Sequence, residues 1–294
     1  MRGHSKLQKF LIICAVVFVC GIVCSIAGAA SGGVQDMEKI ADRYDWINSP
    51  GARGVTAQKV EDYHSIDITG SVDVWLVGKD YYTAASWLAD QDVLEQTELD
   101  VIGPGQVCVV AGDRMGQPEI SVDKGVLKIN SETIDLTGIN LELTEATFYP
   151  EILVCVPDEM LESLHVSGQA ADVNVLGVSW KKAKIELNAG DIDLEDVKSR
   201  SLTLETDAGD IELGGELMGT TSVITDAGDI EIDSPLAKAE YAFDVETVSG
   251  DVKVKEAGQD EKAYESGEKV SEEGGPHRIS VKTDAGDVKL WFGK

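Results

Sequence analysis

Residues 185–194 read IELNAGDIDL, and the same ten-residue phrase returns four times further along the chain. The later copies are LETDAGDIEL (204–213), VITDAGDIEI (223–232), VETVSGDVKV (245–254) and VKTDAGDVKL (281–290). Their central glycines lie 19, 19, 22 and then 36 residues apart. A unit that returns at such a period indicates stacked supersecondary pieces that share one continuous core. The sequence therefore predicts a repeat protein, and a repeat of this kind carries no evident reaction chemistry.

Within each copy, apolar and polar residues alternate, which is the period of a β-strand. Aligned by their Gly-Asp pairs, the copies place like residues in columns, such as Ile192, Ile211, Ile230, Val252 and Val288. Coils of a parallel β-solenoid stack equivalent side chains about 4.8 Å apart, whereas antiparallel meanders give no reason for such columns. We therefore predict an all-β fold, a parallel β-solenoid or β-helix with coils of about 19–22 residues. Glycine would supply a positive φ between the two strands of each coil.

The candidate binding residues of the repeat are the aspartates that follow its glycines: Asp191, Asp210, Asp229, Asp251 and Asp287. Stacked in a file, neighbouring carboxylates about 5 Å apart would repel by about 0.8 kcal/mol even in water. Two compensations are open. The favoured one is structural, with each carboxylate accepting hydrogen bonds from N–H groups of its own turn. The other is a divalent cation such as calcium that bridges adjacent coils, although no calcium nonapeptide or EF-hand loop occurs.

The next outward column changes sign along the chain, running Asp193, Glu212, Glu231, Lys253, Lys289. If the coils stack in chain order, the step from Glu231 to Lys253 is the attractive pair of this column, and an exposed pair adds little stability.

Residues 10–30 contain no charged side chain and follow Arg2, Lys6 and Lys9. Such a run is long enough to cross a bilayer, and its basic flank predicts a cytoplasmic tail (1–9) and an extracellular remainder. Ala27-Gly28-Ala29 also fits a signal-peptidase site, so secretion after cleavage near Ala29 stays open. The apolar run exceeds the usual length of a signal-peptide core, which favours a retained transmembrane helix (10–30) in the cell membrane.

Beyond this helix we expect a juxtamembrane stalk (31–58) with a short amphipathic helix, and then a β-solenoid ectodomain (60–290). The ectodomain divides into irregular coils (60–165) and regular Gly-Asp repeats (166–290). Strands are expected in the irregular part at 65–69, 72–77, 107–110, 126–129 and 152–156. The acidic segment 259–276 is predicted to be a mobile loop. Cys108 and Cys155 are either two buried thiols, which we favour, or one disulfide.

The chain carries 53 acidic against 25 basic residues, a formal net charge of −28. Nucleic acid and anionic lipid are therefore poor partners, whereas cationic peptides or divalent cations would be attracted to the ectodomain. The histidines and cysteines lack metal-ligand spacing, and no GxSxG, P-loop or dinucleotide motif occurs. We predict no catalytic residues and no cofactor.

Three features carry a resemblance to a known family: SIDITGSVDVWL (65–76), EILVCVPDEMLESLHVSG (151–168) and the serial Gly-Asp-[Ile/Val]-x-[Leu/Ile/Val] units. Over about residues 60–290 the chain resembles the bacterial β-solenoid ectodomains called "putative adhesins", a domain-of-unknown-function family. The resemblance implies a non-catalytic cell-surface protein that acts as an adhesin-like binding or scaffolding ectodomain. The alternative is a component that senses envelope stress or antimicrobial peptides together with a membrane partner. A polysaccharide-active β-helix enzyme is the least favoured interpretation.

Overall fold

The computed structural model describes residues 53–81, 106–112, 118–131, 151–157 and 159–293. The chain divides into two compact units, Met1–Ala52 and Arg53–Lys294, and the described residues belong to the second. The predicted tail (1–9), the transmembrane helix (10–30) and most of the stalk (31–58) lie outside them. Within the described ranges, no helix is long and apolar enough to cross a membrane.

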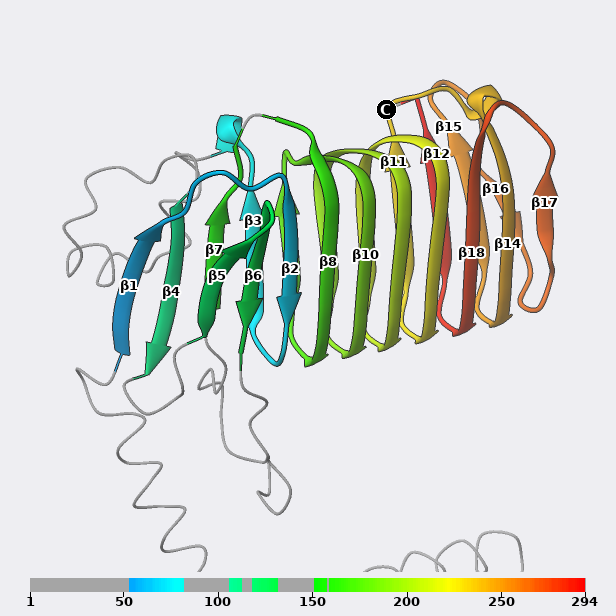
Figure 1. Ribbon diagram of the computed structural model, residues 1–294. Coiled ribbons are helices and arrows are strands. Elements are labelled where there is room, and N and C mark those ends of the chain that lie inside the picture. The colour runs from blue at the N-terminus through cyan, green and yellow to red at the C-terminus, as the bar shows by residue number, and fades with distance from the viewer. Residues whose placement is uncertain (1–52, 82–105, 113–117, 132–150, 158, 294) are drawn as a thin grey trace, which may run out of the picture. The chain divides into compact units, whose positions relative to one another are not determined.

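The described unit is all-β, as predicted (Figure 1). Its strands are β1 (Arg53–Lys59), β2 (Ser65–Thr69), β3 (Asp73–Val77), β4 (Gln106–Gly112), β5 (Glu119–Asp123), β6 (Val126–Asn130), β7 (Glu151–Cys155), β8 (Leu161–Ala170), β9 (Val173–Leu176), β10 (Ser179–Ala189), β11 (Ile192–Ala208), β12 (Ile211–Ala227), β13 (Ile230–Ser234), β14 (Tyr241–Ser249), β15 (Val252–Glu256), β16 (Lys262–Tyr264), β17 (Val270–Glu272), β18 (His277–Ala285) and β19 (Val288–Phe292). Two 3-10 turns, η2 (Lys79–Tyr81) and η4 (Lys238–Glu240), join them. The five strands expected before the repeats are confirmed.

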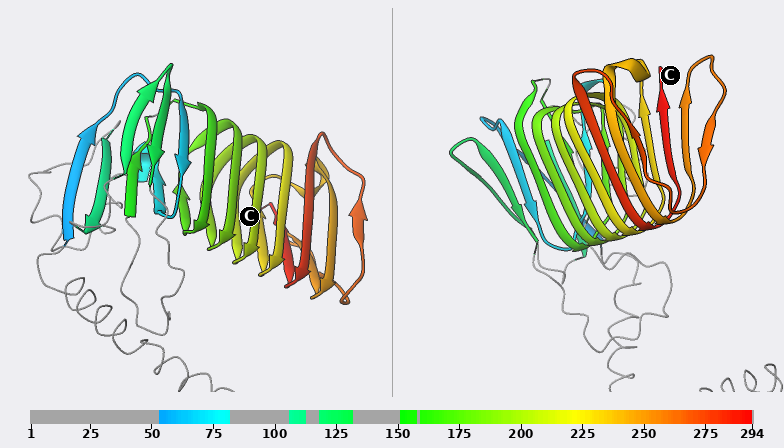
Figure 2. Two further views of the ribbon diagram at one scale, coloured as in Figure 1. Left: turned by 60° about the horizontal axis from the view of Figure 1, so that its bottom comes forward. Right: turned by 90° about the vertical axis from the view of Figure 1, so that its right-hand side faces the viewer.

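The strands form two faces. The long-strand face runs, in spatial order, β5, β6, β2, β8, β10, the second half of β11, the second half of β12, β18, β14 and β17. The short-strand face runs β1, β4, β7, β3, β9, the start of β11, the start of β12, β13, β19, β15 and β16. Pairing between the coils of the Gly-Asp repeats is parallel, which confirms the solenoid, and Figure 2 shows these coils stacked side by side.

The core lies between the two faces and is built from the columns that the alternation predicts. The column of Ile192, Ile211, Ile230, Val288 and Val252 is at most 1% exposed. Each such aliphatic side chain contributes about 1.5–3 kcal/mol when it leaves water. Identical side chains stack because parallel coils in register bring equivalent positions together.

The coils do not stack in chain order. β13 continues through residues 235–240 into β14, yet β14 pairs with β18, and β18 pairs with β12. On the short-strand face, β19 likewise lies between β13 and β15. The last repeat of the chain is therefore inserted between two earlier ones. The predicted Glu231–Lys253 step is wrong for this reason: Glu231 faces Lys289, with Oε2 and Nζ 3.2 Å apart.

The acidic segment 259–276, predicted above to be a mobile loop, instead forms β16 and β17. β16 pairs antiparallel with β15, and β17 pairs antiparallel with β14, so both lie along the outer edge of the last coil. The chain then returns over the start of β14. A Cβ at Gly274 would lie 1.9 Å from the carbonyl oxygen of Tyr241, so glycine is required at this crossing.

Two further expectations concern the N-terminal part. β1 begins at Arg53 and pairs antiparallel with β4, so the sheet includes the last residues that the sequence assigned to the stalk. Cys155 is a buried thiol, as favoured. Cys108 lies on the neighbouring strand, opposite Leu153 rather than opposite Cys155.

Candidate functional site

The predicted file of aspartates forms a hydrogen-bonded ladder along the edge where the Gly-Asp turns stack. The backbone N–H of each aspartate donates to the carboxylate Oδ1 of the aspartate on the neighbouring coil. The N···O distances are 2.8 Å for Asp210 to Asp191, 2.7 Å for Asp229 to Asp210, 2.8 Å for Asp287 to Asp229 and 2.8 Å for Asp251 to Asp287. The ladder continues through Asp172 to Asp73, at 3.0 Å for each step. The carboxylates of Asp191, Asp210, Asp229 and Asp287 therefore each cap an N–H on the adjacent coil and not on their own turn as the sequence suggested, and Asp251 ends the ladder as a donor.

The other polar atoms of the turn are also used. The N–H of Gly209 donates to the carbonyl of Ala227 at 3.0 Å, and the buried hydroxyl of Thr225 donates to the carbonyl of Gly209 at 3.4 Å. Gly209 itself has φ +150°, and a Cβ there would lie 2.0 Å from the carbonyl oxygen of Gly190. The recurrent Thr-x-Ala-Gly-Asp phrase thus has a structural explanation at each of its polar positions.

This ladder bears directly on the calcium hypothesis. A cation at the ladder would have to compete with N–H groups for the Oδ1 atoms, because these oxygens already accept hydrogen bonds. Within the described residues, no three His, Cys, Asp or Glu side chains converge as metal ligands. Whether calcium binds Asp191, Asp210, Asp229, Asp251 or Asp287 stays a matter for experiment.

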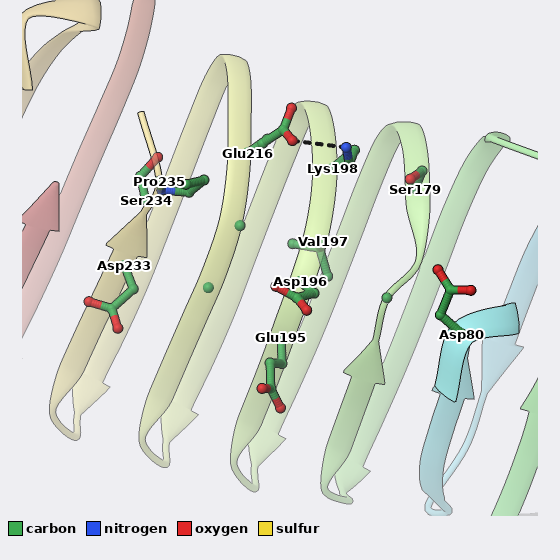
Figure 3. Close-up of a pocket in the computed structure, with 13 residues that line it drawn as sticks. Asp80, Ser179, Glu195, Asp196, Val197, Lys198, Glu216, Asp233, Ser234 and Pro235 are labelled. Carbon is green, nitrogen blue, oxygen red and sulfur yellow. Dashed lines mark ion pairs between the residues drawn. The ribbon is translucent and has the colours of Figure 1, made fainter. Parts of the chain in front are cut away.

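A second acidic surface lies on the short-strand face, opposite the turns. The acidic groove consists of two adjoining hollows of about 630 and 330 Å³ that share Glu195, Gly214 and Asp233. Eight carboxylates and one lysine line it: Asp80, Asp193, Glu195, Asp196, Glu212, Glu216, Glu231, Asp233 and Lys198. Figure 3 shows several of these side chains projecting from neighbouring coils. The lysine is paired with Glu216, with Nζ and Oε1 2.8 Å apart.

The groove exists because the coils bend here and carry little side-chain bulk. The β11–β12 register shifts between Leu194 and Val197, where the chain turns from one face to the other. Gly214 and Gly215 occupy the equivalent bend of the next coil. A Cβ at Gly214 would meet nothing closer than 3.6 Å, so the column between Glu195 and Asp233 is open at this point.

Two carboxylates of the groove, those of Glu212 and Asp193, belong to exposed residues, yet their charged forms are disfavoured. Burial raises the pKa of Glu212, and the neighbouring carboxylates of Asp193, Glu231 and Asp210 raise it further, against a smaller lowering by Lys289. Burial also raises the pKa of Asp193. A cation placed over these residues would favour their ionised forms and relieve the repulsion.

The sequence identified part of this groove. The column Asp193, Glu212, Glu231 was predicted to face outward, and the structure confirms its register. No role was predicted for Glu195, Asp196, Glu216, Asp233 or Asp80. Glu195, Glu216 and Asp233 share a signal, a carboxylate that follows a Gly-Asp-[Ile/Val]-x-[Leu/Ile] unit within three residues, and Asp196 follows at once after Glu195. Asp80 lies in η2, outside the repeats.

The structure also gathers charged groups on the long-strand face. His165 on β8 lies between carboxylates of β2 and β10, with its Nδ1 2.9 Å from Asp67 and its Nε2 3.6 Å from Glu186. Lys184 pairs with Glu186 at 2.5 Å. The contacts of His165 are explained by cross-strand pairing on an exposed sheet surface, and the Lys184–Glu186 pair lies within β10; each of these contacts contributes little.

The chain matches the protein family described as Toastrack DUF4097 over residues 114–291. Curated proteins gave no match. Solved structures that resemble it include a "putative adhesin" from Bacteroides fragilis (12% identity, 82% of this chain and 98% of the other, TM-score 0.40) and a "putative cell adhesion protein" from Clostridium sporogenes (9%, 82% and 98%, TM-score 0.35). A "putative lipid binding protein" from Parabacteroides distasonis is 14% identical over 83% of this chain and 95% of the other, with a TM-score of 0.27. These TM-scores lie below 0.5, so the three structures support no statement about this chain.

Proposed function

The chain belongs to the Toastrack DUF4097 family, and we propose that it acts without catalysis, as a cell-surface ectodomain for adhesin-like binding or scaffolding. Its binding surface is the acidic groove, and its partner presents a cationic segment. The observation that carries this proposal is the concentration of eight carboxylates in a hollow of the short-strand face, of which Glu216 pairs with Lys198 and Glu231 pairs with Lys289.

The charge of the groove supports a cationic partner. The raised pKa of Glu212 reflects burial and repulsion among the groove's own carboxylates, and this unfavourable energy falls when positive charge enters. The Gly-Asp ladder is a poorer binding surface, although it is equally acidic, because its Oδ1 atoms already accept backbone N–H groups.

The experiment is a titration with decalysine at physiological salt, measured by calorimetry, on matched variants. The groove variant carries Glu195→Gln, Glu212→Gln and Asp233→Asn, and the ladder variant carries Asp191→Asn, Asp210→Asn and Asp229→Asn. Both remove three negative charges, and asparagine keeps the acceptor that the ladder needs. Since each exposed pair contributes about 0.2–1 kcal/mol, the loss of three pairs in the groove variant should raise Kd by roughly 3- to 150-fold, and the ladder variant should change it much less. Equal weakening would mean that only the overall charge attracts the peptide.

The placement on the cell is part of the proposal. Residues 10–30 anchor the chain in the cell membrane, with residues 1–9 in the cytoplasm and the β-unit outside. Protease added to intact, wall-stripped cells should then digest the β-unit, while the remaining N-terminal fragment stays with the membrane. A mature chain in the medium that begins near Ala30 would instead establish cleavage and secretion.

The acidic groove also favours a second candidate function, the sensing of envelope stress or cationic antimicrobial peptides together with a membrane partner. Such peptides carry the charge that the groove attracts. Adhesion and sensing differ in what removal of the gene does: a sensor's loss abolishes a transcriptional response to a cationic peptide, and an adhesin's loss reduces surface attachment. Neighbouring genes for a two-component system or a sigma factor would support sensing.

A further inference from the structure

The last repeat of the chain occupies an internal position. The C-terminal coil, β18 with β19, lies in a slot whose walls are β12 and β13 on one side and β14 and β15 on the other. The two walls are joined to each other by residues 235–240, without passing through the coil. Figure 1 shows β18, coloured near the red end of the chain, between β12 and β14.

The connection that holds the C-terminal coil differs from those of the preceding repeats. Successive coils from β10 to β13 are joined by short bends inside the continuous strands β11 and β12, near residues 195–197 and 214–215, and cannot move apart without unfolding. The C-terminal coil is instead attached through the tether, the 20 residues 257–276. The tether contains only two described strands, β16 and β17, each of three residues on the outer edge. Fully extended, 20 residues span about 65–70 Å, which is enough to reach a neighbouring molecule.

An empty slot would be strongly unfavourable. The coil's inward residues Ile279, Val281, Thr283, Val288, Leu290 and Phe292 are at most 2% exposed. Phe292 packs against Tyr241 and Phe243, with ring centroids 5.3 and 5.9 Å apart. A coil that leaves its slot therefore exposes apolar surface on itself and on both walls of the slot. The exposed coil must then enter an equivalent slot, and the empty slot must receive an equivalent coil.

We propose that the slot is an interaction site for the C-terminal coil of a second copy of this chain. Two molecules exchange residues 277–292 through their tethers, and each slot is filled by the coil of the other. The exchanged coil makes the same parallel ladders, the same Glu231–Lys289 pair and the same ring contacts as the chain's own coil. Exchange of an identical element is a low-cost route to a closed dimer, since no new interface has to be built. It gives a surface protein a means of self-association that leaves the acidic groove open.

The proposal also predicts when the dimer forms. Exchange requires β16 and β17 to leave the edge formed by β15 and β14. Once released, a tether of this length holds its own coil at an effective concentration on the order of 1 mM, so the monomer dominates in dilute solution. Refolding at higher protein concentration should raise the dimer fraction about tenfold for each tenfold increase while dimers are rare.

A disulfide across the slot distinguishes exchange from any other dimer. Glu246 on β14 and Lys282 on β18 are exposed register partners. Parallel neighbours are about 4.8 Å apart, within the Cα separation that a disulfide needs. Glu246→Cys with Lys282→Cys is introduced into the full-length chain, whose natural cysteines are replaced by alanine. The control pair is Thr203→Cys with Ser222→Cys, on β11 and β12, which cannot exchange.

Both variants are refolded across a concentration series up to about 1 mM in mild detergent, separated by gel filtration, oxidised and examined on a denaturing, non-reducing gel. The slot pair should give an intrachain disulfide in the monomer and a covalent dimer in the dimer fraction, while the control pair stays within one chain in both. A dimer whose slot disulfides lie within each chain would overturn the proposal, and so would the absence of any dimer when the monomer forms its slot disulfide.

Discussion

The aspartate ladder predicts that Asp210→Asn and Asp210→Ala differ in their effect on the free energy of unfolding. Asp210 Oδ1 accepts the N–H of Asp229 at 2.7 Å. Asp210→Asn keeps an acceptor at this position, and it removes repulsion with two neighbours of about 0.8 kcal/mol each at the dielectric of water. It also replaces a charge-assisted hydrogen bond with a neutral one, which costs about 1 kcal/mol. The two effects nearly cancel, so Asp210→Asn should leave the free energy of unfolding within about 1 kcal/mol of the parent.

Asp210→Ala removes the acceptor altogether. The N–H of Asp229 then loses its partner, although water can reach this edge, so the cost should fall near 1–2 kcal/mol relative to Asp210→Asn. For a domain of this size that difference corresponds to roughly 2–8 °C in Tm. Thermal unfolding of the two variants at low and high salt is the assay, since salt screens the repulsion and leaves the hydrogen bond in place. Equal stability of Asp210→Ala and Asp210→Asn at both salt concentrations would refute the ladder.

Three further predictions concern single positions. Gly209→Ala places a Cβ 2.0 Å from the carbonyl of Gly190 at φ +150° and should cost at least about 3 kcal/mol by urea unfolding, whereas Gly214→Ala, with open space around it, should change stability by less than about 1 kcal/mol. Trp180→Phe removes the buried 2.9 Å bond from Nε1 to Ser199 Oγ and should cost about 1–3 kcal/mol, and a double-mutant cycle with Ser199→Ala that shows no coupling would contradict this. The folded state raises the pKa of Glu212 above its ordinary value of 4.5, so ionised Glu212 lowers the free energy of unfolding at pH values above 4.5. This penalty is relieved as the pH falls towards 4.5. Glu212→Gln should therefore be more stable than the parent at pH 7, with a gain that shrinks towards pH 4.5.

The sequence specified the coil interior because period-two alternation and a fixed repeat are both visible in one chain. The sequence alone assigns Ile192, Ile211 and Ile230 to one buried column and the Gly-Asp pair to a turn. The role of the threonine before each turn was not predicted, since Thr225 reaches a carbonyl of a neighbouring coil and sequence proximity does not reveal that contact.

The stacking order of the last two coils could not be read from the sequence. The phrases at 245–254 and 281–290 are alike, and each offers a lysine, Lys253 or Lys289, to face Glu231. Charge and hydrophobicity therefore fit either order. The tether holds a clue in Gly274 and Gly275, whose close passage over β14 gives the acidic segment a structural role that its composition did not indicate.

The acidic groove was missed in part for a related physical reason. Strand alternation predicts which side chains face outward, but it does not predict where coils bend. Glu195, Asp196 and Asp233 lie at that bend, so they meet only once the register shift after Leu194 is known.

The claim that the groove and not the turn ladder receives a cationic partner is tested most directly by hydrogen–deuterium exchange with and without saturating decalysine. Binding in the groove should slow exchange in residues 192–198, 211–216 and 230–235, and leave the turns at 188–191, 207–210 and 226–229 unchanged. Slowed exchange centred on the turns, or none in the groove at saturation, would contradict the assignment of the binding surface.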